Sequence, residues 1–542
     1  MSSITSQRIG KYTYYYESTS FRNEQGKPRN KKLKIAKKDP KTGEIIYTPE
    51  YIARLVADPD LPRVKNSGLM SVFTTDVPTT SANDQIAIEI LDTVKIYGQY
   101  WFLHEIGTKI GLINILQSIF GKEWQEIFAL ACYLIISDKP IMYCEDWVSE
   151  SEMPDVGSMS SPRISELLAN FGEHERNVFY KSWHQHVKER EYIALDITSI
   201  SSYSKQRSDC ERGYNRDGDK LAQLNICMLF SETSRLPVYQ TNYSGSLGDV
   251  STLECTIKKF QAILGEFEYS FIMDKGFCSI KNVNMLLDKG VSFLVSVPFS
   301  NSFAKNQVES QCKNIDQVEN TILTNDSPVR GVHKVRSWGK KGKKVHTHIF
   351  FDPVKALKKR NDLFALIKTL KNYVNSGSGD EYKKEIDKYL IVRKSNNAEN
   401  GYTINVRQDV VDEALKTSGW LVLISDHIDD PQQAHELYRA KDVVEKGFWK
   451  YKNSLGIERL RVHSDERADN KSFIAFISLI LSSYINNVMK DKRIYDQMTF
   501  DKLMLVLAKM KSTTINGKRI TRPLTKQQKD LLKAFDMKLH VG

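Results

Sequence analysis

The order of expected elements between residues 192 and 297 constrains the fold more than any other feature of the chain. Strand and helix patterns follow one another here as strand, strand, strand, helix, strand, helix, strand. The segments are, in order, YIALDITSI, LAQLNICMLFS, LPVYQTNYSG, a helix over about 249–264, FEYSFIMDKGF, SIKNVNMLLDKG and VSFLVSVP. Three strands at hairpin spacing followed by two crossover units predict a mixed sheet, and therefore an α/β fold.

Composition and periodicity divide the rest of the 542-residue chain into further regions. The expected regions are a β-rich basic region over 1–75, a linker over 74–84, a helical region over 85–190, an α/β domain over 191–299 and 418–490, an insertion over 300–417, and a basic region over 491–542. The strong apolar pattern of SFIAFISLILSSYINNVM predicts a helix that packs on the sheet.

A net charge of +12 and a pI near 9.0 favour a polyanionic partner. The charge gathers in three clusters, two of which carry aromatic residues: one near Lys31 and Lys32, one near Trp338, Lys340 and Lys341, and one near residues 509–522. Basic clusters with aromatics suit phosphate neutralisation combined with base stacking. A solubilising loop explains any single cluster equally well, whereas three separate clusters favour nucleic acid.

Cysteine usage and the N-terminal sequence bear on the cellular compartment. Seven cysteines occur singly, without a Cys-x-x-Cys pair, which argues against a zinc site or a disulfide framework and for a reducing compartment. The opening MSSITSQRIG has no apolar core of a secretory signal. Apolar stretches such as Phe473–Ile485 are too short and too polar to span a bilayer, so we expect no membrane association.

Three acidic residues occupy positions that a sheet could bring together. Asp196 lies in the middle of the first strand, Asp274 ends the fourth strand, and Glu445 lies on a later helix. Converging carboxylates are hard oxygen ligands for Mg²⁺ or Mn²⁺, and two such ions can drive phosphodiester chemistry. The alternatives are a buried ion pair for Asp196 and a turn-forming role for Asp274 before Lys275-Gly276.

The segment 435–452 has the pattern of an amphipathic helix. Tyr438, Lys441, Glu445 and Lys452 fall on one polar stripe about 60° wide at roughly 100° per residue. Beside the stripe lies an apolar face made by Leu437, Ala440, Val444, Phe448, Tyr451 and Leu455. Such a helix could hold a metal ion with its glutamate and a phosphate with its lysines and tyrosine. The same spacing is also typical of a surface helix with solvated i,i+4 pairs.

Together, YIALDITSI, FIMDKGF and the pattern Tyr-x2-Lys-x3-Glu-x6-Lys resemble the catalytic DDE motifs of bacterial insertion-sequence transposases. The particular resemblance is to the hairpin-forming group with a Tyr-Arg-Glu-Lys signature, and it covers most of the chain. It implies a ribonuclease-H-like catalytic domain over 191–299 and 418–490, interrupted by a mainly β insertion over 300–417. It also implies DNA binding by residues 1–75 and DNA binding or dimerisation by residues 85–190.

Carried over residue by residue, the resemblance makes Asp196, Asp274 and Glu445 the catalytic residues and the ligands of Mg²⁺ or Mn²⁺, with two ions per active site. Tyr438, Lys441 and Lys452 would contact phosphates near the transposon end. Lys441 replaces the arginine of the signature, which keeps the charge but loses the bidentate fork.

The family also has a tryptophan that stacks on a base flipped out during hairpin formation. Trp420, in the strand before the signature helix, matches that position, and Trp338 in the basic insertion is a rival for the role. An ordinary core position is the alternative for Trp420.

The resemblance implies a cut-and-paste DNA transposase that binds terminal inverted repeats, cleaves through a hairpin and joins the 3′-hydroxyl ends to target DNA. Its partners would be double-stranded DNA and a second copy of the chain in a synaptic homodimer. It would act in the bacterial cytoplasm, associated with the nucleoid when bound to DNA. The alternatives are a metal-dependent nuclease of the same fold without strand transfer, and a domesticated DNA-binding protein without catalysis.

Overall fold

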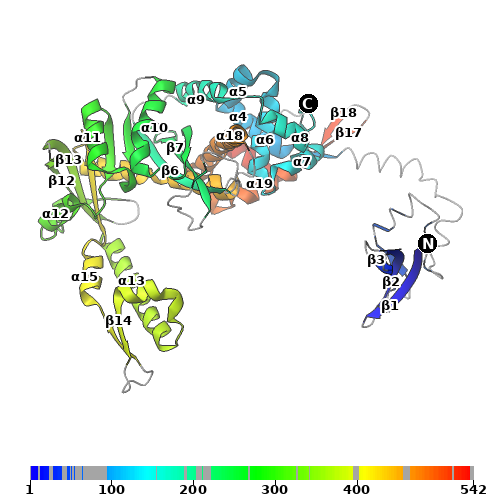
Figure 1. Ribbon diagram of the computed structural model, residues 1–542. Helices are drawn as coiled ribbons and strands as arrows, with labels where there is room; N and C mark the ends of the chain where they lie inside the picture. Colours follow the sequence, from blue (N-terminus) through cyan, green and yellow to red (C-terminus); the bar gives the residue numbers. More distant parts are fainter. Residues whose placement is uncertain are drawn as a thin grey trace. The chain divides into compact units, whose positions relative to one another are not determined.

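The computed structural model of the chain contains two compact units, each with its own sheet and hydrophobic core (Figure 1). The first unit comprises residues 1–94 with 514–516, and the second comprises residues 95–513 with 517–542. The described residues are 2–9, 12–22, 28–38, 45–48, 50–51, 54, 61, 64, 94–153, 156–187, 192–202, 210–211, 221–265, 269–324, 328–340, 342–394, 402–455, 464–515 and 518–537.

The first unit contains a four-stranded antiparallel sheet in the order β1-β2-β3-β4. Its strands are β1 (Ser2–Ile9), β2 (Tyr12–Arg22), β3 (Pro28–Lys38) and β4 (Ile45–Tyr47). Basic and aromatic side chains meet on this sheet, where Lys34 Nζ lies 4.0 Å from the centre of the Tyr14 ring. The expected linker over 74–84 lies outside the described residues.

Helices dominate the start of the second unit. They are α4 (Gly98–Lys109), α5 (Leu112–Phe120), α6 (Trp124–Ile136), α7 (Cys144–Glu150), α8 (Ser161–Leu167) and α9 (Glu173–Val187). The long helix α18 (Asp465–Asp491) packs between α6 and the sheet strand β8 (Pro237–Ser244). This packing confirms that the apolar segment after the signature helix covers the sheet.

Helix α18 corrects one expectation from the sequence. It extends beyond Phe473–Ile485 on both sides and, among the described residues, is long and apolar enough to cross a membrane by length and composition alone. However, 78% of its most apolar 18-residue stretch is buried inside the protein. Core helices of globular proteins can be equally long and apolar, and the contacts of α18 with α6 and β8 are those of a core helix.

A nine-stranded mixed sheet organises the second unit, in the order β11-β12-β13-β16-β10-β9-β6-β7-β8 (Figure 1). The half of the sheet that comes first in the sequence consists of β6 (Tyr192–Ser202), β7 (Ala222–Ser231), β8, β9 (Ser270–Met273) and β10 (Ser292–Ser296). β6, β9 and β10 are parallel neighbours, while β6, β7 and β8 form an antiparallel meander. The mixed α/β sheet expected from the sequence is therefore confirmed.

The two crossover helices of this half begin and end where the sequence indicates. α10 (Asp249–Leu264) joins β8 to β9, and α11 (Ile280–Lys289) joins β9 to β10. The Ser279 hydroxyl accepts a hydrogen bond from the backbone N–H of Asn282 at the start of α11, and Gly290 ends it with φ +63°. A serine N-cap and a left-handed glycine are efficient helix boundaries, which fixes the length of the crossover.

The region over 300–417 does not form one separate domain. Its strands β11 (Thr321–Ile322), β12 (Val329–Trp338) and β13 (Lys343–Phe351) join the nine-stranded sheet, where β13 pairs with β16 (Trp420–Ser425). The helix α12 (Ser302–Gln311) packs on β13 and β16. The insertion therefore widens the α/β sheet.

The remainder of the insertion forms a lobe with its own small core (Figure 1). Its elements are α13 (Pro353–Asn375), α14 (Lys383–Tyr389), β14 (Leu390–Lys394), β15 (Tyr402–Val406) and α15 (Gln408–Lys416). Across 300–417 the helices α12 to α15 contain more of the described residues than the strands β11 to β15 do, so the expectation of a mainly β insertion is wrong for the described residues.

The C-terminal region contains both helices and strands. Its elements are α19 (Phe500–Ala508), β17 (Lys511–Ile515), β18 (Lys518–Thr521) and α20 (Lys526–Ala534). β17 and β18 form a three-stranded sheet with β5 (Lys95–Ile96), and the expected turn at Asn516-Gly517 falls outside the described residues.

Candidate active site

The two aspartates lie at adjacent positions of the sheet. Leu195 of β6 is paired with Met273 of β9 in a parallel register, and Asp196 and Asp274 are the next residues on each strand. Neighbouring strands are about 4.8 Å apart, so the two carboxylates emerge side by side. The backbone N–H of Ile197 donates a 2.8 Å hydrogen bond to Asp196 Oδ1, which helps to orient that carboxylate.

The expected signature helix crosses the face of the sheet in three pieces. α16 (Pro431–Ala440) contacts β9 and β10, and α17 (Asp442–Trp449) contacts β6 and β7. A π-helical turn follows over Lys450–Ser454, so the segment is not the continuous α-helix that its periodicity predicts. Five of its six expected apolar residues are nevertheless buried, which confirms the face: Leu437, Val444, Phe448, Tyr451 and Leu455.

A glycine lets α17 approach the sheet closely. A Cβ atom on Gly447 would lie 2.3 Å from the ring of Phe230 on β7, so any larger residue would force the helix away. Tyr451 anchors the following turn because its hydroxyl lies 3.0 Å from the Ser472 carbonyl oxygen of α18. These contacts fix the height of Glu445 above Asp196 and Asp274.

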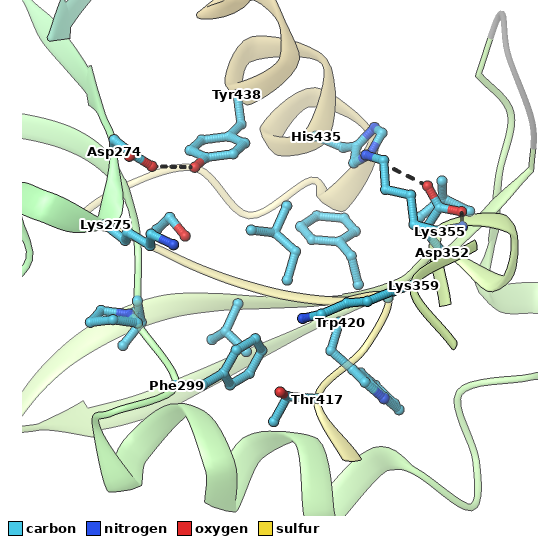
Figure 2. A pocket seen from close by; sticks show the side chains of 18 of the residues that line it. Asp274, Lys275, Phe299, Asp352, Lys355, Lys359, Thr417, Trp420, His435 and Tyr438 are labelled. Atoms are coloured by element: carbon cyan, nitrogen blue, oxygen red, sulfur yellow. Dashed lines mark hydrogen bonds and ion pairs between the residues drawn. The ribbon is translucent and has the colours of Figure 1, made fainter. Parts of the chain in front are cut away.

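Two residues of the signature helix contact the aspartates directly. The Tyr438 hydroxyl donates a hydrogen bond to Asp274 Oδ1 over 3.1 Å (Figure 2). Burial, followed by the charge of Asp274, raises the pKa of Tyr438 well above its usual value, so the phenol stays protonated and acts as a donor. Lys441 Nζ lies 3.6 Å from Asp196 Oδ2 and 3.1 Å from Glu445 Oε1.

Lys441 faces inward, which differs from its expected place on a DNA-facing stripe. Its side chain is only 4% exposed. Burial by itself lowers the pKa of Lys441, but the carboxylates of Asp196, Asp274 and Glu445 outweigh burial and raise the pKa above its usual value. An ammonium group therefore lies among all three candidate metal ligands.

The donor chemistry of the three acids fits a divalent cation such as Mg²⁺ or Mn²⁺, which prefers oxygen ligands. Among the described residues, no three His, Cys, Asp or Glu side chains are arranged closely enough to hold a metal ion as they stand. Glu445 is the most exposed of the three acids, with its side chain 62% exposed, compared with 14% for Asp196. The acids share Lys441 as their common cationic neighbour.

A cavity of about 930 Å³ adjoins Asp274 and Tyr438 on the side of the insertion (Figure 2). Trp420, at the start of β16, lines this cavity opposite Tyr438, and its ring centre lies 4.9 Å from that of Phe351. Figure 2 shows Lys359 of α13 pointing into the cavity toward Phe299 and Trp420. An aromatic and cationic pocket therefore lies next to the carboxylates.

Trp338, the other candidate for stacking on a flipped base, is buried in the core. It is the last residue of β12 and not a loop residue, its side chain is 1% exposed, and its ring packs edge-on against Phe303 at 5.0 Å. A base could reach it only if this part of the core opened.

The other expected DNA-contacting lysines are spread over the chain. Lys452 is half-buried in the π-helical turn, and Lys340 and Lys32 are exposed. Lys31 belongs to β3, and Lys341 lies outside the described residues.

Sequence reasoning missed the exposed Trp449. Its side chain is 65% exposed on α17, four residues after Glu445 and therefore on the same helical face. It also missed Phe299 and Lys359, because their proximity to Trp420 depends on the pairing of β13 with β16. The helical spacing could have identified Trp449.

The fold and the site define a mixed α/β protein with a large mixed sheet, consistent with a ribonuclease-H-like fold, and with two carboxylates at adjacent positions of neighbouring parallel strands. The sequence model of the transposase DDE domain family matches residues 188–481, which is more than half of the chain. The chain therefore belongs to this family and is a transposase that acts in DNA transposition. Members of the family generally use divalent metal ions.

Comparison with solved structures gives a second similarity. A piggyBac transposase, solved by cryo-EM as a synaptic complex with hairpin DNA, aligns with 71% of this chain and 70% of its own at 11% identity, with a TM-score of 0.33. No curated protein matches the chain significantly.

Proposed function

We propose that the chain is a cut-and-paste transposase of the bacterial hairpin-forming group, with Tyr438, Lys441, Glu445 and Lys452 as its signature. The observation that carries this proposal is the parallel register of β6 and β9, in which Asp196 lies beside Asp274, with α17 packed on β6 and α16 packed on β9. The lysine at position 441 stands where that group has arginine. The protein would act on DNA in the bacterial cytoplasm.

In this proposal Asp196, Asp274 and Glu445 would hold two Mg²⁺ or Mn²⁺ ions. When bound, such ions activate the attacking oxygen and stabilise the leaving oxygen of a phosphodiester. The hydrogen bond from Tyr438 orients Asp274, and the packing of Gly447 on Phe230 sets the height of Glu445. Hydrolysis of one strand by water would free a 3′-hydroxyl at the transposon end. This hydroxyl would attack a phosphodiester of the opposite strand, whose broken bond releases the flanking DNA and leaves a hairpin. A second water would open the hairpin, and the regenerated 3′-hydroxyl would attack a phosphodiester of target DNA, whose broken bond leaves the target nicked at the joint.

The cavity beside Asp274 supports a place for the flipped base. Trp420 would stack on it, since aromatic stacking of a base is worth about 1–3 kcal/mol. Trp449 would stack on the DNA end outside the cavity. The basic regions over 1–75 and 491–542, Lys340, Lys341 and Lys452 would neutralise phosphates, and two copies of the chain would pair two ends in a synaptic homodimer.

The experiment incubates the full-length protein with labelled duplexes carrying the inverted repeats that flank its gene, in Mg²⁺ or Mn²⁺. Nicked, hairpin and target-joined products are separated on denaturing gels. We expect all three with the parent and none with Asp196→Ala or Glu445→Ala. Asp442→Ala is the matched control, because Asp442 is an exposed acid of the same helix that pairs with Lys446. Cleavage by both catalytic variants at the parental rate would overturn the assignment.

The same gels distinguish the alternatives. A nuclease of the same fold would give nicked ends without joined product. A domesticated binding protein would shift the duplex in a binding assay but give no metal-dependent product.

A further inference from the structure

The side chain of Lys441 points in a different direction from that of Lys446, the exposed lysine of α17. Lys446, five residues later on α17, is largely exposed and pairs with Asp442 on the helix surface. Lys441 instead turns toward the sheet, within 3.6 Å of Asp196 Oδ2 and 3.1 Å of Glu445 Oε1. Its ammonium therefore bridges the sheet and the helix across the candidate active site.

The chemistry of this position is that of a cation site. Carboxylates brought together repel one another unless a positive charge lies between them. An ammonium is a compact charge with three donors on a flexible stem, so it can neutralise several carboxylates and can also swing away. A divalent metal ion requires the same oxygens. A metal ion bound to these oxygens would therefore compete with the ammonium for Asp196 and Glu445.

We propose that Lys441 is a built-in counter-cation, which holds Asp196 and Glu445 together in the metal-free protein and withdraws when a divalent metal ion takes the same oxygens. This inference rests on the proposed function, because it takes the three acids as the metal ligands. It also gives a reason for lysine at a position where the signature has arginine. The planar guanidinium fork binds a carboxylate through two parallel hydrogen bonds and would be harder to displace.

The decisive experiment measures Mn²⁺ binding to the full-length protein without DNA, by calorimetry or by electron paramagnetic resonance of free Mn²⁺. We expect Lys441→Met to bind Mn²⁺ roughly tenfold more tightly than the parent, which corresponds to about 1.4 kcal/mol. Lys446→Met, the matched control on the same helix, should bind as the parent does. An equal or weaker affinity in Lys441→Met would show that the ammonium does not compete, and would overturn the inference.

A second measurement uses the parent alone and does not depend on whether Lys441→Met folds. Brief acetylation followed by mass spectrometry reports how accessible each lysine is. Labelling of Lys441 should rise on addition of Mg²⁺, whereas labelling of Lys446 should stay the same. If Lys441 remains protected with metal bound, its withdrawal is disproved.

Asp196→Asn separates this inference from the proposed function. If it leaves Mn²⁺ binding at the parental level, the metal-ligand assignment fails, and the inference fails with it. If it weakens Mn²⁺ binding while Lys441→Met leaves the affinity unchanged, only the role of Lys441 is overturned.

Discussion

The half of the sheet formed by β8, β7, β6, β9 and β10 contrasts with the half formed by β16, β13, β12 and β11. In the first, the parallel register of β6 and β9 places Asp196, in the middle of β6, beside Asp274, the residue that follows β9. In the second, β13 and β16 are antiparallel, and Trp420 with the start of α13 lines the cavity beside Asp274. Under the proposed function, the first half would perform the chemistry and the second half would bind the substrate.

Removing a carboxylate from the first half should have the largest effect. Asp274→Asn keeps the size of the side chain but removes the charge on which a metal ion depends, so we expect the loss of detectable strand cleavage. Binding of the inverted-repeat duplex, measured by fluorescence anisotropy, should remain. Asp288→Asn is the control, because Asp288 is an exposed acid on α11 that pairs with Lys343. Retained cleavage in Asp274→Asn would remove the chemical distinction between the halves.

Replacing Trp338 should mainly affect stability, whereas replacing Trp420 should mainly affect hairpin formation. Trp338→Ala removes a fully buried ring and should lower the free energy of unfolding by about 3–5 kcal/mol. Trp420→Ala, at a half-buried position, should lower the free energy of unfolding by clearly less. It should reduce the yield of hairpin product, because it removes a stacking interaction worth about 1–3 kcal/mol. Urea unfolding measures the first effect and hairpin yield the second. The opposite pattern would make Trp338 the stacking residue.

A buried lysine, Lys450, anchors the π-helical turn that follows α17, the helix packed on β6 and β7. Lys450 Nζ donates to the Ser482 carbonyl oxygen over 3.2 Å and lies 3.7 Å from the centre of the Phe500 ring. Burial lowers the pKa of Lys450 to about 7, from an ordinary value of 10.5. The unfolded chain therefore holds this proton up to about pH 10.5, whereas the folded chain releases it near pH 7.

Because the unfolded state binds more protons between these two pH values, the free energy of unfolding should rise with pH across this window. The contribution of one such group is at most about 1.4 kcal/mol per pH unit. Lys450→Met should abolish this contribution, as seen in the difference between the two urea-unfolding profiles from pH 7 to 10. Lys490→Met, an exposed lysine at the end of α18, is the control. Parallel profiles for parent and Lys450→Met would show that Lys450 does not titrate in this range.

The first half of the sheet could be predicted from the sequence because its signals are local. Apolar strand segments, the Ser279 cap and Gly290 determine the elements between 192 and 297, and crossover connections then make β6, β9 and β10 parallel neighbours. The adjacency of Asp196 and Asp274 follows from that topology. The second half depends on the pairing of β13 with β16, which are far apart in the sequence, so the widened sheet and its cavity could not be predicted.

The direction of Lys441 could not be predicted for a related reason. Its spacing to Glu445 indicates an i,i+4 pair on a helix surface, which the structure contains. The spacing does not reveal that α17 lies close enough to β6 for the same ammonium to reach Asp196. The close approach depends on Gly447 and Phe230, which are distant in sequence and meet only in the folded chain.

The smallest expected effect concerns the grip of the second half on DNA. Lys359→Gln removes one positive charge that points into the cavity. If this ammonium contacts a phosphate, the slope of log affinity against log salt should fall by about 1, with a modest loss of affinity. The cleavage rate at saturating DNA should not change, because the carboxylates are untouched. Lys358→Gln is the matched control, since Lys358 is an exposed neighbour on α13 that does not line the cavity. An equal change of the salt slope in both variants would indicate a general electrostatic attraction and no specific contact by Lys359. A change in cleavage rate at saturating DNA would mean that the second half also takes part in the chemistry.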